Sequence, residues 1–146
     1  MQQLTTPSNP GRFVLVARHG PAALTGIAQA AALMARADGK ADVIEQQVLL
    51  RFLRRHDLLR SFGRRACLDA YRTELRRAAP EPEVLETLCR QRSRISAQLI
   101  ASAAASIAMA DGAAHPAEVE LLCRLAERLR VLDTCDEVAA VLFRAQ

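Results

Sequence analysis

The chain has 146 residues, of which 51% are apolar and 25% charged; this composition excludes a disordered chain and suits one globular domain with its own core. Alanine is abundant, tryptophan is absent and aromatic residues make up only 3%, a balance that favours helices over strands. The net charge of +4, carried almost entirely by arginine, allows an anionic partner but does not require one.

Two further features concern the compartment. The N-terminal MQQLTTPSNPGR lacks the basic start and apolar run of an export signal, and no stretch of about 18 uninterrupted apolar residues could span a membrane. We therefore predict a cytoplasmic protein without a transmembrane segment. The cysteines form no CxxC pair and are predicted to be reduced and mostly buried: Cys67, Cys89, Cys123 and Cys135.

The chain divides into a tail and one domain. Residues 1–20 are predicted to be a tail with a short segment, and residues 21–146 a single helical domain. Pro21 fits the first turn of a helix whose apolar residues repeat at helical spacing through about Ala37. Asp38-Gly39 ends that helix.

Three further helices are predicted next. The second begins near Asp42, which can form a reciprocal capping box with Glu45 three residues later. The third runs from about Arg64 to Ala79, and two prolines separate it from a short fourth helix. The residues predicted to face the core are Val48, Leu49, Phe52 and Leu53, then Cys67, Leu68, Tyr71 and Leu75, then Val84, Leu85 and Leu88.

The last third of the chain predicts three more helices. A fifth, rich in alanine and serine, runs to about Ala110 and is followed by Asp111-Gly112. A sixth starts at Pro116, and Asp133 or Thr134 can cap a seventh. The apolar stripes of the last two are Val119, Leu122, Ala126 and Leu129, then Val138, Val141 and Leu142.

This pattern predicts an all-α fold, a compact bundle of about seven helices, and it decides against one competing interpretation. The segment FVLVARHG (13–20) resembles the strand and Arg-His-Gly of histidine phosphatases. That fold needs a sheet and a second catalytic histidine, but no strands follow, and the other histidines are His56 and His115. We interpret Arg18-His19-Gly20 as a turn before the first helix.

Two segments of the chain resemble each other, residues 32–53 and 106–129. In each, an apolar helix ends in Ala-Asp-Gly, and a glutamate follows six residues after the glycine, in the first turn of the next helix. This correspondence predicts a duplicated helix-loop-helix unit with pseudo-twofold packing. The matched residues are Asp38, Gly39 and Glu45 in the first segment and Asp111, Gly112 and Glu118 in the second.

Helix capping explains part of the repeat. Glycine supplies a left-handed C-terminal cap, aspartate bonds nearby backbone N–H groups, and the helix dipole favours glutamate in a first turn. Capping alone would tolerate serine, threonine or asparagine at several of these positions, yet the same acid pair occurs twice. The loops are not EF-hands, because the earlier ligand positions fall on helical residues: Met34 and Arg36, or Ile107 and Met109.

The paired units of apolar helix, Ala-Asp-Gly and Glu-led helix, in an all-helical domain of this size, resemble the tellurite-resistance TerB-like family. That family is related to the N-terminal region of the DjlA co-chaperones. The resemblance covers about residues 22–146. It implies a compact seven-helix bacterial domain linked to metal- or oxyanion-stress response, although the family label does not say that this protein handles tellurium.

The resemblance also implies a divalent-cation site, because acidic residues of the family are proposed to bind one. An all-oxygen ligand set suits calcium, magnesium or manganese better than zinc. His115-Pro116 stands where Asp42-Val43 stands in the first segment, so the second unit lacks one carboxylate and the site is asymmetric. Carried over by position, the metal ligands are Asp38, Asp42, Glu45, Asp111 and Glu118.

No catalytic constellation accompanies these loops, so we expect a non-enzymatic module with no cofactor other than the cation. The alternative is a protein- or anion-interaction module, of the co-chaperone, nucleic-acid or membrane-surface kind, that uses the arginines between Arg51 and Arg94. Interspersed acids favour a solvated, salt-bridged face, and the scarcity of aromatics disfavours nucleic acid. An unknown protein partner, a peripheral membrane contact and a homo-oligomer stay open.

Overall fold

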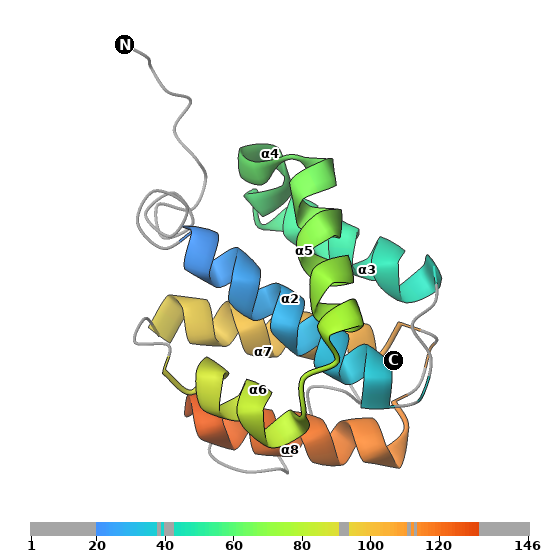
Figure 1. The fold of residues 1–146 in the computed structure, drawn as a ribbon, viewed down its shortest axis with the longest axis vertical. Coiled ribbons are helices and arrows are strands. Elements are labelled where there is room, and N and C mark those ends of the chain that lie inside the picture. The colour runs from blue at the N-terminus through green and yellow to red at the C-terminus, as the bar shows by residue number, and fades with distance from the viewer. Residues whose placement is uncertain are drawn as a thin grey trace.

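The computed structural model describes residues 20–37, 39, 43–90, 94–110, 112 and 114–131. Helices are the regular secondary structure throughout this part of the chain, with no strand among the described residues (Figure 1). The predicted all-α fold is therefore confirmed. In chain order the helices are α2 (Gly20–Ala37), α3 (Val43–Arg55), α4 (Leu58–Phe62), α5 (Arg64–Arg77), α6 (Glu81–Leu88), α7 (Arg94–Ala108) and α8 (Pro116–Leu129).

Two helices rich in small residues form the centre of the fold. α2 packs along α7, and both helices bury alanines completely, including Ala30 and Ala31 of α2 and Ala103 and Ala104 of α7. Alanine loses no side-chain entropy in a helix, and its small size allows two backbones to approach closely. The many alanines of α2 and α7 thus allow these two helices to pack closely.

The remaining helices cover the pair on two sides. Figure 1 shows α3, α4 and α5 together in its upper part and α6 and α8 in its lower part. α5, α6 and α8 contact α2, whereas α3 and α8 contact α7. The largest apolar side chains fill the space between these helices: Ile27, Met34, Leu49, Leu53, Leu58, Tyr71, Leu88, Ile100, Ile107 and Leu125.

The predicted helices correspond to α2, α3, α5, α6, α7 and α8, with ends that agree to within a few residues. The sequence pattern missed α4. Asp57 and Gly63, with φ of 65° and 86°, interrupt the helix on either side of it, and five residues are too few to show a helical period. The predicted seventh helix, from Asp133 or Thr134, lies outside the described residues, as do Arg18 and His19.

The predicted core residues are buried to different depths. In α5, Cys67 and Tyr71 are 1% exposed, whereas Leu68 and Leu75 are only partly buried against the core. Val119 of α8 is likewise partly buried. In α5 the difference follows from helix geometry: at about 100° per residue, Tyr71 lies about 40° round the helix from Cys67, whereas Leu75 and Leu68 lie about 80° and 100° from it, at the edge of the buried face.

Candidate functional site

Two helix-to-helix junctions, from α2 to α3 and from α7 to α8, contain the repeated Ala-Asp-Gly. Gly39 and Gly112 both have positive φ, 79° and 100°. Each glycine amide donates to the carbonyl three residues earlier, to Arg36 at 3.1 Å and to Met109 at 3.0 Å. A turn closed by a glycine with positive φ therefore follows both helices, overlapping the last turn of α2 and coming directly after the end of α7.

A glutamate occupies the third position of each following helix. Glu45 in α3 and Glu118 in α8 are the acidic residues of the two first turns, and both are buried, with 5% and 2% exposure. A buried carboxylate is costly unless hydrogen bonds or a cation compensate for its lost hydration. The burial of both glutamates distinguishes them from ordinary first-turn acids on a helix surface.

Glu118 also caps its own helix. Its Oε1 accepts a hydrogen bond of 2.9 Å from the backbone N–H of His115, the residue just before α8. This is the glutamate half of a capping box. The bond compensates part of the cost of burying the carboxylate, and the dipole at the N-terminus of α8 lowers that cost further.

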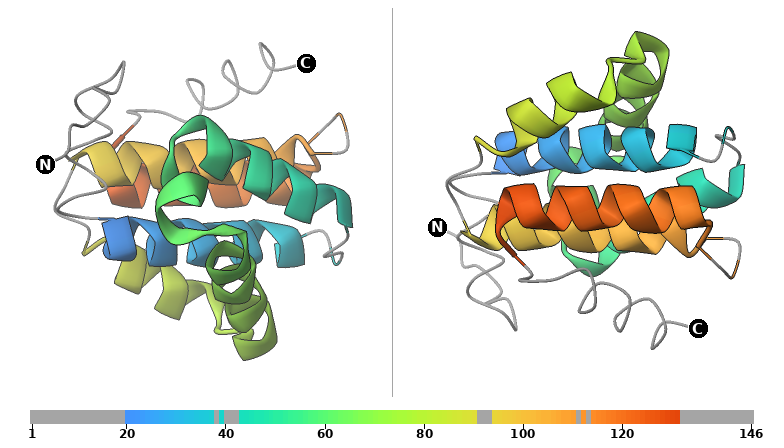
Figure 2. Two further views of the ribbon diagram at one scale, coloured as in Figure 1. Left: turned by 90° about the horizontal axis from the view of Figure 1, so that it is seen from above. Right: turned by 90° about the horizontal axis from the view of Figure 1, so that it is seen from below.

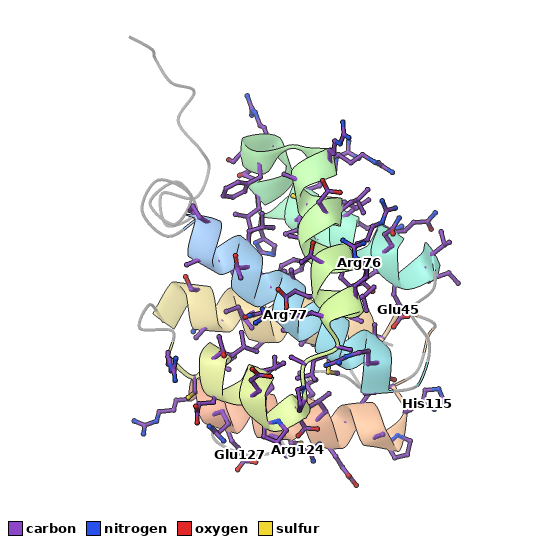
Figure 3. All side chains as sticks on the ribbon, viewed as in Figure 1. Glu45, Arg76, Arg77, His115, Arg124 and Glu127 are labelled. Atoms are coloured by element: carbon purple, nitrogen blue, oxygen red, sulfur yellow. The ribbon has the colours of Figure 1, made fainter. Side chains whose placement is uncertain are left out.

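The two junctions lie at the same end of the domain. Figure 2 shows that α2 and α7 end, and α3 and α8 begin, on one side of the bundle. Glu45 and His115 accordingly lie on the same side of the molecule in Figure 3. At this end the N-termini of α3 and α8 carry partial positive charge, which favours carboxylates, and the C-termini of α2 and α7 carry partial negative charge, which favours a cation.

The predicted ligand set is only partly described by the structure. Glu45 and Glu118 are described, whereas Asp38, Asp42 and Asp111 lie outside the described residues. Within the described ranges, no group of three or more histidine, cysteine, aspartate or glutamate side chains is placed to hold a metal. The five-residue site therefore stays a prediction, as does the pseudo-twofold arrangement of the two units.

Several polar contacts elsewhere were not evident from the sequence. Arg36, in the last turn of α2, reaches the linker between α5 and α6 and donates to the carbonyl of Ala79 at 2.6 Å. Arg124 of α8 pairs with Glu81 of α6 through two hydrogen bonds. Both contacts connect segments that are distant in the sequence. The only local sequence feature that hints at either contact is the position of Arg36, a basic residue in the last turn of α2.

The thiols of the described region are not paired in disulfides. Cys67 and Cys123 are buried as predicted, and burial raises the pKa of the Cys67 thiol. Cys89 is only partly buried. Its Sγ donates to the carbonyl of Glu86 at 3.0 Å and accepts from Arg128 at 3.7 Å. Cys135 lies outside the described residues.

The arginines of α3, α4 and α5 lie on the surface. Residues 43–77 contain nine arginines and four acidic residues, and all nine arginines are exposed. Of the four acids, only Asp69 is exposed, since Glu45 is buried and the other two are half-buried. Some of these arginines have polar partners: Arg77 lies 3.8 Å from Glu74, and Arg72 contacts the neutral Gln46.

None of the helices in the described part of the chain has the length and apolar character needed to cross a membrane.

The family model of the tellurite resistance protein TerB matches residues 24–139. The chain belongs to the TerB family. The match includes both Ala-Asp-Gly junctions and the arginine-rich helices, so this TerB-family chain carries all of its candidate functional residues inside the matched region. No curated protein and no solved structure matches the chain.

Proposed function

We propose that this TerB-family chain is a non-enzymatic stress-response module that binds a divalent cation at the end of the domain where α3 and α8 begin. The observation that carries the proposal is the burial of Glu45 and Glu118 at equivalent positions of two junctions on the same side of the bundle. The family resemblance supports it, because family members are proposed to use acidic residues at these positions for a cation. The non-enzymatic part rests on membership of TerB, which is generally not a classical enzyme family.

The chemistry of the candidate ligands suits a hard cation. The predicted set, Asp38, Asp42, Glu45, Asp111 and Glu118, offers only carboxylate oxygens. Calcium, magnesium and manganese prefer such oxygens, whereas zinc prefers nitrogen and sulfur. If two of these carboxylates lie about 5 Å apart, they repel each other by roughly 3 kcal/mol at an effective dielectric constant near 20, and a shared cation would remove that repulsion.

Direct titration tests the proposal. Calcium, magnesium and manganese are each titrated into the EDTA-treated full-length protein in an isothermal calorimeter. We expect saturable heat with at least one of the three metals and a competing loss of that heat when EDTA is added back. Absence of saturable heat with all three would overturn the proposal and leave the acidic residues as helix caps.

A second candidate function is favoured by the exposed arginines of α3, α4 and α5. Residues 43–77 carry nine exposed arginines and one exposed acid, Asp69, a balance that attracts an anionic partner. This candidate and the cation site use different side chains. The two functions can therefore be tested separately and can coexist in one domain.

A further inference from the structure

The solvent-facing side of α3 combines apolar and basic residues. Val43 and Ile44 are 65% and 48% exposed, and they are the large hydrophobic side chains exposed in the described part of the chain. They lie in the first turn of α3, which runs along the edge of the fold (Figure 1). Two neighbouring aliphatic side chains in water lose the free energy that burial would supply, so their exposure calls for an explanation.

Helical spacing places these two residues on the same side as three arginines. Positions 44, 51 and 55 follow one line along α3, and positions 43, 47 and 54 follow the adjacent line. The opposite side of the helix packs into the core. The exposed face, which we call the α3 face, consists of Val43, Ile44, Gln47, Arg51, Arg54 and Arg55, without an acidic residue.

The surroundings of the α3 face add to its positive charge. Arg72 of α5 donates to Gln46 of α3 at 3.4 Å, which brings a further guanidinium beside the helix. Arg51 and Arg54 form no ion pair with any residue in the part of the chain that the structure describes. The face therefore offers two guanidinium groups, those of Arg51 and Arg54, without an ion-pair partner among the described residues, next to an exposed aliphatic pair.

We infer that the α3 face docks onto a membrane surface rich in anionic phospholipid. In this arrangement the arginines bind lipid phosphates while Val43 and Ile44 enter the boundary between headgroups and acyl chains. An aliphatic pair suits acyl chains, whereas single-stranded nucleic acid prefers exposed aromatic rings for stacking. In this region Phe52 and Tyr71 are buried and Phe62 is partly buried against the core. The inference gives the arginine candidate a specific partner and does not depend on the cation site.

Vesicle sedimentation of the full-length protein, with EDTA present throughout, tests the docking. We expect binding to vesicles of equal parts phosphatidylglycerol and phosphatidylcholine, and none to phosphatidylcholine alone. Each arginine strengthens binding to such a surface about fivefold, so Arg51→Gln with Arg54→Gln should weaken partitioning about thirtyfold. Val43→Ser with Ile44→Ser should weaken it about tenfold or more, because fewer methyl groups are buried.

A matched control removes the same charge elsewhere. Arg77→Gln with Arg90→Gln removes two exposed arginines outside the α3 face, which lie 3.8 Å from Glu74 and 3.4 Å from Glu86. This variant should lose only a small part of the vesicle binding. A loss equal to that of the Arg51 and Arg54 variant would mean that net charge alone drives binding, and would overturn the assignment to this face. Circular dichroism of every variant checks that the helical fold is retained.

Insertion can be observed directly because the chain contains no tryptophan. Ile44→Trp places a single reporter on the α3 face, and Thr87→Trp places one on the exposed side of α6. We expect the emission of the first to shift to the blue on addition of phosphatidylglycerol vesicles and the second to stay unchanged. If the Ile44→Trp variant binds the vesicles but its emission does not shift, insertion of the apolar pair is refuted.

Oligonucleotide binding separates this inference from the broader arginine candidate. A fluorescent single-stranded DNA is titrated with the protein at physiological salt, beside the vesicle experiment. Retained tight DNA binding with no vesicle binding would overturn the membrane partner while keeping an anion-binding role for the arginines. Vesicle binding with only weak, salt-sensitive DNA binding is the result that the inference requires.

Discussion

Arg124 of α8 and Glu81 of α6 form a two-point ion pair, with Nε–Oε2 and Nη2–Oε1 distances of 2.6 and 3.0 Å. The residues lie 43 positions apart, and the pair joins two helices that cover the same side of the central α2 and α7. The hydrogen bonds that Arg124 donates to Glu81 raise the pKa of the Arg124 guanidinium above its ordinary value. A planar guanidinium that faces a carboxylate at two points is better ordered than a single-point pair.

This geometry predicts a measurable coupling energy. In a double-mutant cycle of Arg124→Gln and Glu81→Gln, we expect about 0.5–1 kcal/mol, at the upper end for partly exposed pairs, because the two side chains are 48% and 34% exposed. Arg90 and Glu86, 3.4 Å apart with 73% and 65% exposure, serve as the control and should couple by less than about 0.5 kcal/mol. Urea unfolding measures both cycles. Equal coupling in the two pairs would show that the two-point geometry adds nothing.

The left-handed glycines predict a second effect. Nothing lies within 4 Å of a Cβ built at Gly39 or Gly112, so a larger side chain there would not clash. The cost of substitution is the strain of holding a non-glycine residue at positive φ. We expect Gly39→Ala and Gly112→Ala each to lower the free energy of unfolding by about 1 kcal/mol. Asparagine tolerates positive φ better than alanine, so Gly39→Asn and Gly112→Asn should cost less. Alanine variants as stable as the asparagine variants would contradict the left-handed assignment.

The raised pKa of the Cys67 thiol predicts how stability depends on pH. The unfolded chain releases this proton near the ordinary value of 9.0, whereas the folded chain retains it to higher pH. The folded state therefore binds more protons above pH 9.0, and its stability falls as the pH rises through that range. One group contributes a slope of at most about 1.4 kcal/mol per pH unit. Below pH 9.0 this contribution is fully present.

Replacing Cys67 shows how much its thiol contributes to the loss of stability at alkaline pH. We expect Cys67→Ala to be less stable at neutral pH, because it removes a buried sulfur, but to lose stability less steeply between about pH 9 and pH 10.5. Urea unfolding at a series of pH values gives both slopes. The same steepness in the two proteins would indicate that other groups, and not Cys67, cause the alkaline loss.

Local signals in the sequence predicted most of the helices, since those signals act within a few residues. Pro21 and Pro116 near helix starts, and glycines at 39 and 112 after helix ends, have the same meaning in any fold. Contacts across the fold were not predictable in this way. Arg36 with the Ala79 carbonyl and Arg124 with Glu81 each span 43 residues, and helical periodicity defines a face without naming its neighbour.

The candidate site shows the same division. The repeat predicted that Glu45 and Glu118 occupy equivalent positions, and both are indeed the third residue of their helices. Their burial could not be read from the pattern, because first-turn glutamates ordinarily face water, and only packing against the central helices decides their exposure. The exposure of Val43 and Ile44 is the converse case, because aliphatic side chains of a kind that is usually buried lie here at the surface.

The hydrogen bond from the His115 N–H to Glu118 makes the two explanations of the acidic repeat separable by experiment. A glutamine side chain can accept the same bond through its carbonyl oxygen, yet it carries no charge for a cation. Glu45→Gln with Glu118→Gln therefore keeps capping and removes two candidate ligand charges. The matched control is Glu83→Gln with Glu120→Gln, which makes the same charge change at two exposed positions.

Thermal melting of EDTA-treated protein then distinguishes a cation site from helix caps. A cation that binds only the folded state stabilises it by about 2.7 kcal/mol at a hundredfold excess over Kd, which raises the melting temperature of a domain of this size by several degrees. We expect that rise with calcium, magnesium or manganese in the native chain and in the control variant, and its loss in the Glu45 and Glu118 variant. Without metal, that variant should be as stable as the native chain or slightly more so, because two buried charges are removed. Helix caps alone predict the opposite: no response of the native chain to any of the three metals, and mild destabilisation of the variant through the lost charge–dipole interaction.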